Sequence, residues 1–162
     1  MQTSPSVGRR LSGHAALRRG RNFRPRQIYH LTVTTLARAP IFGNFEAACA
    51  ACRCFQDTAL LGDAGLMAWV LMPDHAHWLL QLGERHCLPE VVNRLKSASA
   101  RAANAALERS GTVWNRAFHD HALRDVDDLQ AAARYIIANP VRAGLVSRVG
   151  DYPFWNAIWL SQ

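Results

Sequence analysis

Residues 66–82 read LMAWVLMPDHAHWLLQL, and this stretch decides the fold. Its first seven residues, Leu66 to Met72, are an unbroken apolar run of strand length. Pro73-Asp74 is a turn signal, and residues 75–82 form a second run with strand character. Two strands separated by so short a turn predict an antiparallel hairpin.

The segments on either side of this hairpin predict a mixed architecture. In chain order they are a strand at 28–35, a helix at 45–61, a helix at 88–107, a strand or bent strand pair at 113–123, and a helix from Asp127 or Asp128 to Ala138. Asn139-Pro140 is expected to interrupt that last helix. The order predicts an α+β fold, a ferredoxin-like sandwich in which helices pack on an antiparallel sheet.

Length and composition exclude several classes of protein. The chain has 162 residues, of which 49% are hydrophobic and 19% charged, as expected for one globular domain rather than a disordered chain. No apolar run reaches membrane-spanning length, and the N-terminus lacks the apolar stretch of a signal peptide. We therefore expect a cytoplasmic protein with no membrane partner and no disulfide framework.

The excess positive charge lies at the N-terminus. The net charge is +7, and residues 1–26 hold seven arginines and no acidic residue, so residues 27–162 are formally neutral. We predict a basic, flexible arm at 1–26 and a single domain at 27–162. A solvated tail would have the same composition, but uncompensated arginines favour phosphate binding and hence a polyanionic ligand. The residues expected to bind that ligand are Arg18, Arg19, Arg21, Arg24, Arg26 and, in the domain, Arg142.

His75-Ala76-His77 is the sharpest local candidate for a metal site. Alternate residues of a strand point to the same face, so the two imidazoles would stand side by side and could share a divalent cation. The pair is weak evidence on its own, because His119-Asp120-His121 repeats the pattern. The cysteines at 49, 52 and 54 do not predict zinc, since no second ligand pair follows at zinc-finger spacing.

Tyr135 is the second candidate, in the predicted helix before Asn139-Pro140. It lies off the apolar stripe of that helix, on a face shared with Asn139 and Arg142. Spacing alone favours a structural tyrosine at the edge of the core. A positioned phenol can instead attack a polarised phosphate, and the Asn139 amide oxygen could ligate a metal one turn further on.

Four ordered blocks resemble the REP-associated tyrosine transposases, a branch of the single-strand HUH transposases. The resemblance extends from about Ile28 to Trp159. The blocks are LMPDHAHWLL at 71–80, VWNRAFHDH at 113–121, RYIIANPVRAGLV at 134–146 and DYPFW at 151–155.

The resemblance implies an activity and a set of site residues. His75 and His77 match the metal ligands of the family, Asn139 the residue that completes its metal site, and Tyr135 its catalytic tyrosine. The implied enzyme uses Mg²⁺ or Mn²⁺ to cut single-stranded DNA beside hairpins of repetitive extragenic palindromes. Its tyrosine forms a 5′-phosphotyrosine link and releases a 3′-hydroxyl.

Two rival interpretations follow from the same residues. A binding module of the same fold would hold hairpin DNA or RNA without cutting it. An unrelated metal-dependent hydrolase would use the histidine pair and dispense with Tyr135. A metal-bound water and His121 both stay open as acceptors of the Tyr135 proton, and both a monomer and a homodimer stay open.

Overall fold

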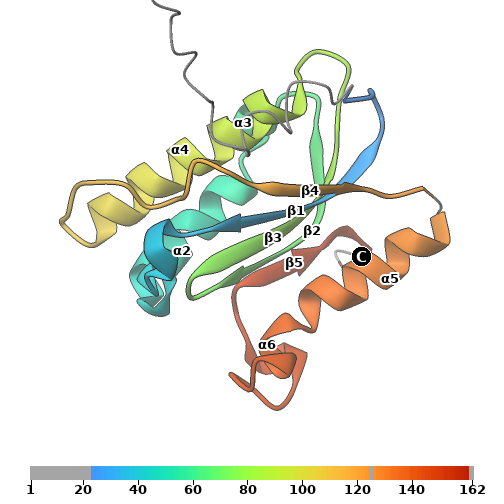
Figure 1. The fold of residues 1–162 in the computed structure, drawn as a ribbon. Coiled ribbons are helices and arrows are strands. Elements are labelled where there is room, and N and C mark those ends of the chain that lie inside the picture. The colour runs from blue at the N-terminus through green and yellow to red at the C-terminus, as the bar shows by residue number, and fades with distance from the viewer. Residues whose placement is uncertain (1–22, 125, 161–162) are drawn as a thin grey trace, which may run out of the picture.

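A five-stranded antiparallel sheet organises the computed structural model, which describes residues 23–124 and 126–160. The strand order is β4-β1-β3-β2-β5 (Figure 1). The strands are β1 (Ile28–Thr34), β2 (Gly65–Met72), β3 (His75–Gln81), β4 (His119–Ala122) and β5 (Trp155–Ala157). Strands β2 and β3 form the predicted hairpin, with Met72 paired to His75 across the turn.

Helices cover the two faces of the sheet unequally (Figure 1). They are α2 (Phe45–Phe55), α3 (Thr58–Leu61), α4 (Leu88–Ala106), α5 (Val126–Ile137) and the short α6 (Asn139–Arg142). Helices α2, α3 and α4 enclose the larger core on one face, and α5 packs over β2 and β3 on the other. The predicted α+β sandwich is confirmed. None of the described helices is long and apolar enough to cross a bilayer.

Strand β1 shows how the sequence divides the two faces. Tyr29, Leu31 and Val33 are buried in the larger core beneath α2 and α4. The residues between them alternate to the opposite face because successive side chains of a strand point in opposite directions. That second face therefore receives the polar side chains of His30, Thr32 and Thr34.

The prediction of one helix at 45–61 is wrong in one respect, because this segment forms two helices, α2 and α3. The Asp57 carboxylate accepts a hydrogen bond from the Ala59 N–H at 2.9 Å and caps a new helix, α3. An aspartate at the N-cap satisfies a free N–H group in the first turn of a helix, so α2 ends before Asp57 and a new helix begins after it.

The strand or bent strand pair predicted at 113–123 is confirmed only in part. Only β4, at 119–122, pairs along β1, and Trp114 makes an isolated bridge to Thr35. Residues between them are held by side chains, since the buried Lys96 ammonium donates to the carbonyl oxygens of Asn115 and Arg116. Strand β5 was not predicted, because three residues are too few to show the alternation of apolar and polar residues that identifies a strand.

Residues 23–26 of the predicted arm are attached to the domain. Phe23 packs against the larger core, and its ring meets that of Tyr29 edge-on with centroids 5.9 Å apart. The Arg24 N–H donates to the Tyr29 hydroxyl at 3.0 Å, and the Arg26 N–H donates to the Leu82 carbonyl oxygen at 2.9 Å. Residues 1–22, with the predicted Arg18, Arg19 and Arg21, lie outside the described residues.

Replacing Phe55 with alanine is expected to destabilise the domain strongly. Phe55 is 1% exposed and meets the rings of Trp69 and Trp78 edge-on at 5.4 and 5.2 Å. Deleting the ring leaves a cavity between α2 and the sheet, so we expect a loss of about 3–5 kcal/mol in the free energy of unfolding. Urea titration followed by tryptophan fluorescence measures it, and a change below about 1 kcal/mol would contradict this packing.

Candidate active site

The register of β1 and β3 gathers four polar residues on the face of the sheet that α5 partly covers. Thr32 is paired with His77, and Thr34 with His75. Directly paired residues of antiparallel strands project to the same side. The two histidines therefore stand on one face beside a strip of β1 hydroxyls, as the alternation of β3 predicts.

His75 is oriented by an acidic neighbour in the turn. Its Nδ1 lies 2.6 Å from Asp74 Oδ1, and the second carboxylate oxygen of Asp74 lies 3.3 Å from Arg38 Nε. A carboxylate that accepts from Nδ1–H fixes the tautomer and leaves Nε2 as the lone-pair nitrogen. The Nε2 atom of His75 is thus the one available to a ligand.

His77 is oriented by β1. Its Nδ1 lies 3.0 Å from Thr32 Oγ1 and 3.2 Å from His30 Nε2. Burial, assisted by the positive charge that His75 and His30 would carry, lowers the pKa of His77 to about 3. Burial first, and then His121, also lowers the pKa of His30. A histidine with so low a pKa is neutral near pH 7, which is the state that binds a metal ion.

Tyr135 of α5 lies on the same face as the histidines. Its ring centroid is 6.5 Å from that of His77 and 6.0 Å from that of His30, and the side chain is half exposed. The guanidinium carbon of Arg142 lies 3.8 Å from the Tyr135 ring centroid. A guanidinium at that distance over an aromatic face makes a cation–π contact. The structure thus brings Tyr135, the histidine pair and Arg142 into one accessible cluster.

The break between α5 and α6 explains how Asn139 and Arg142 are placed. Pro140 has no N–H to donate to Ile136. The Asn139 amide nitrogen donates instead to the Ile136 carbonyl at 3.0 Å, and Arg142 Nη1 donates to the Tyr135 carbonyl at 3.2 Å. Ala138 keeps helical dihedral angles, so the interruption expected at Asn139-Pro140 leaves the chain nearly continuous.

The Asn139 oxygen already has a partner in this arrangement. Arg142 Nη2 donates to Asn139 Oδ1 at 2.7 Å. Asn139 lies one turn after Tyr135, as predicted, but Arg142 already occupies one of the two lone pairs of its oxygen. Its role as a ligand therefore stays a prediction.

The donor set of the histidine pair fits a divalent transition metal. Both Nδ1 atoms are engaged by second partners, which leaves the two Nε2 atoms on one face for a ligand. Among the residues that the structure describes, no three His, Cys, Asp or Glu side chains group as metal ligands, so further ligands must come from an amide, water or substrate oxygen. Two imidazoles favour Mn²⁺ over Mg²⁺, which prefers oxygen ligands.

Other predicted residues lie around this cluster or away from it. His121 is paired with His30, and His119 with Thr32, so the second histidine pair occupies the same face at the sheet edge. The Arg26 guanidinium pairs with Glu84 at 2.8 Å, with both side chains largely exposed. Cys49, Cys52 and Cys54 are free thiols, and burial raises the pKa of Cys52 to about 12, so that thiol does not ionise near neutral pH.

Sequence reasoning missed His30 and Thr32, which contact His77. Asp74 was interpreted as a local turn or salt-bridge residue; it does pair with Arg38, and its carboxylate also holds His75. The polar residues at every second position of 30–34 were a signal for a functional face, because a strand buried on both faces would be apolar throughout. The contacts that His30 and Thr32 make with His77 depend on how β1 pairs with β3, so the sequence of β1 alone does not predict them.

Comparisons with known proteins identify the family of the chain. A family model described as "Transposase IS200 like" matches residues 24–139. The chain is 32% identical over 89 residues to the REP-associated tyrosine transposase of Escherichia coli K12, covering 54% of this chain and 50% of the relative. It is 33% identical over 98 residues to a Haemophilus influenzae protein provisionally given the same name, covering 54% and 56%. The chain thus spans about half the length of these curated relatives.

A solved structure supports the fold. It is a REP-associated tyrosine transposase bound to a REP hairpin, and it superimposes with a TM-score of 0.65 at 23% identity. The match covers 83% of this chain and 79% of that one. Because the family model covers well over half of the sequence and the fold agrees, the chain belongs to the IS200-like transposase family, which confirms the resemblance carried by its four sequence blocks.

Proposed function

We propose that the protein is a metal-dependent nicking and joining enzyme for single-stranded DNA, acting beside hairpins of repetitive extragenic palindromes. The observation that carries the proposal is the position of the half-exposed Tyr135, whose ring lies 6.5 Å from that of His77 on the face of the sheet that α5 partly covers. The DNA substrate is supported by the REP hairpin bound to the structural relative. The basic residues before the domain would add phosphate contacts.

In this mechanism Tyr135 is the nucleophile. Its phenolic oxygen attacks the scissile phosphorus, a bond forms between that oxygen and phosphorus, and the bond from phosphorus to the 3′ oxygen breaks. The DNA downstream of the cut stays attached through a 5′-phosphotyrosine, and the upstream strand leaves with a 3′-hydroxyl. Rejoining reverses the step without an external energy source, because one phosphodiester is exchanged for another.

The remaining residues position the reacting groups. His75 and His77 would hold the cation through their Nε2 atoms, while Asp74 and Thr32 fix the two rings. When bound, a divalent cation withdraws charge from the phosphate oxygens and orients the scissile bond. Arg142 holds the Tyr135 ring from its other side and places a positive charge where the phosphate must approach.

The test uses synthetic hairpins taken from palindromic repeats that flank the gene, each with unpaired flanks. With Mn²⁺, we expect a protein–DNA adduct that survives denaturing electrophoresis and carries the downstream DNA. Fully duplex DNA of the same sequence should react poorly, since its backbone is not free to enter the site. Hairpin binding without adduct or nicking under Mg²⁺ and Mn²⁺ would support the non-cleaving module, and nicking without an adduct would support the hydrolase.

Arg142→Ala is expected to slow adduct formation by about 10- to 100-fold, because the variant loses the ring contact and the bond to Asn139. Arg142→Lys should recover little of the rate, since an ammonium lacks the planar fork that reaches Asn139 and the Tyr135 carbonyl together. Single-turnover rates at saturating DNA measure the effect separately from affinity. Full activity in Arg142→Lys would show that only its charge matters.

A further inference from the structure

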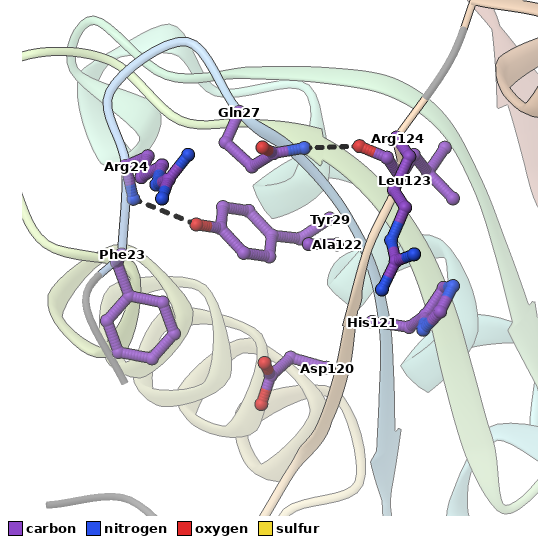
Figure 2. A pocket seen from close by; sticks show the side chains of 9 residues that line it. All are labelled: Phe23, Arg24, Gln27, Tyr29, Asp120, His121, Ala122, Leu123 and Arg124. Atoms are coloured by element: carbon purple, nitrogen blue, oxygen red, sulfur yellow. Dashed lines mark hydrogen bonds between the residues drawn. The ribbon is translucent and has the colours of Figure 1, made fainter. Parts of the chain in front are cut away.

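A hollow of about 700 Å³ lies at the sheet edge formed by β4 and the start of β1 (Figure 2). Its size falls within the range of about 300–1,000 Å³ that is typical of small-ligand sites. Phe23, Tyr29, Arg24, Asp120 and Arg124 contribute to its lining. Apart from Arg24, which is one of the basic residues expected to contact phosphate, none of them has a role in the mechanism above.

The hollow has an aromatic wall. Tyr29 is buried, and the half-buried Phe23 ring meets it edge-on, which leaves part of Phe23 facing the hollow. The hydrogen bond from the Arg24 N–H to the Tyr29 hydroxyl fixes this corner (Figure 2). Anchored aromatic rings are the platforms on which unpaired bases stack in single-strand binding proteins.

Charged groups surround the aromatic wall. Arg24 and Arg124 are exposed, and Gln27 links their segments because its amide donates to the Leu123 carbonyl (Figure 2). The half-buried Asp120 carboxylate faces the same space as the Phe23 ring. Guanidinium groups bind phosphates, whereas a carboxylate repels them and accepts hydrogen bonds from the amino groups of bases.

The hollow is close to the candidate active site. His121, also in its lining, is paired across the strands with His30, and His30 lies 3.2 Å from the His77 ring nitrogen. Tyr29 and Asp120, which is paired with Leu31, project to the face that α2 and α4 cover, whereas His121 projects to the face of the histidine pair. The hollow therefore lies around the β4 edge from the candidate active site, and a DNA strand with a phosphate at the histidine pair would reach it by passing around that edge.

We propose that this hollow binds one unpaired nucleotide of the DNA strand near the cleaved phosphate and prefers a base with an exocyclic amino group. The base would stack on Phe23, Arg24 and Arg124 would contact the flanking phosphates, and Asp120 would accept from the amino group. A carboxylate offers about four acceptor positions, so other partners of Asp120 leave room for this bond. The inference rests on the proposed function only for its choice of DNA as ligand.

Cytosine and thymine make a matched pair of probes. Both are single-ring bases, but cytosine presents an amino group where thymine presents a carbonyl oxygen that the Asp120 carboxylate would repel. The full chain, without added metal so that no cleavage occurs, is titrated against fluorescent twelve-nucleotide oligodeoxycytidine and oligodeoxythymidine. We expect the cytosine strand to bind about 5-fold or more tightly.

Three variants assign the effect to the hollow. Asp120→Asn should bring the ratio of the two affinities close to one, because the amide can donate to thymine as well as accept from cytosine. Phe23→Leu keeps an apolar side chain but removes the ring, and should weaken both strands by about 5- to 100-fold. Arg124→Ala should weaken both, whereas Arg53→Ala on α2, which removes the same charge from an exposed site elsewhere, should have a much smaller effect.

Equal affinity for both strands, no binding of either, or a preference that survives Asp120→Asn would overturn the proposal. So would equal losses in Arg53→Ala and Arg124→Ala, since net charge alone would then explain binding. The adduct assay is independent of these titrations. Adduct formation without a base preference would disprove only the nucleotide-binding role of the hollow. A base preference without adducts would disprove only the proposed nicking and joining activity.

Discussion

Tyr135→Phe is expected to bind hairpin DNA with near-normal affinity and never to become covalently attached to it. The substitution removes one oxygen and keeps the ring, so the contact with Arg142 and the packing near His30 should persist. If the phenolic oxygen is the nucleophile, its loss abolishes the covalent step outright. Denaturing electrophoresis of labelled hairpin with Mn²⁺ measures the adduct, and anisotropy measures binding.

The remaining described tyrosines provide the control. Tyr152 is buried, its hydroxyl donates to the Leu71 carbonyl at 2.6 Å, and burial raises its pKa to about 12. Tyr29 lies on the opposite face of β1 and accepts from Arg24. Tyr29→Phe should therefore keep the adduct. An adduct at full yield in Tyr135→Phe would disprove the assignment of the nucleophile.

Replacing both His75 and His77 with alanine is expected to abolish Mn²⁺-dependent cleavage, with a loss on the order of 1,000-fold. The double variant removes the two Nε2 atoms that the proposal assigns to the cation. It should also lose Mn²⁺ binding, which electron paramagnetic resonance detects as a larger signal from free Mn²⁺. Circular dichroism should show an unchanged fold, since the face on which both side chains lie is only partly covered by α5.

His86→Ala provides a control for the loss of an imidazole elsewhere in the domain. His86 lies in the loop before α4, where its ring contacts Arg94 and Glu90 rather than the candidate site. That variant should keep both Mn²⁺ binding and cleavage. Unchanged cleavage in the double variant would disprove the assignment of His75 and His77 as metal ligands.

Local patterns in the sequence were sufficient for the hairpin and for the order of most elements. The apolar run before Pro73 predicts β2, and the two-residue period of a strand places His75 and His77 on one face without knowledge of any partner. The position of Tyr135 off the apolar stripe of its helix predicts that it avoids the core. These inferences succeed because each depends only on residues within one element.

Tertiary structure decided the surroundings of those residues. His77 meets Thr32 and His30 only because β1, more than forty positions earlier in the chain, pairs with β3 in one register. Strands β4 and β5 are short and lie at the edges, so pairing with a neighbour rather than their own pattern defines them. The packing of α5 over β2 and β3 brings Tyr135 to the histidines, because contacts between distant elements depend on the assembled sheet and not on spacing along the chain.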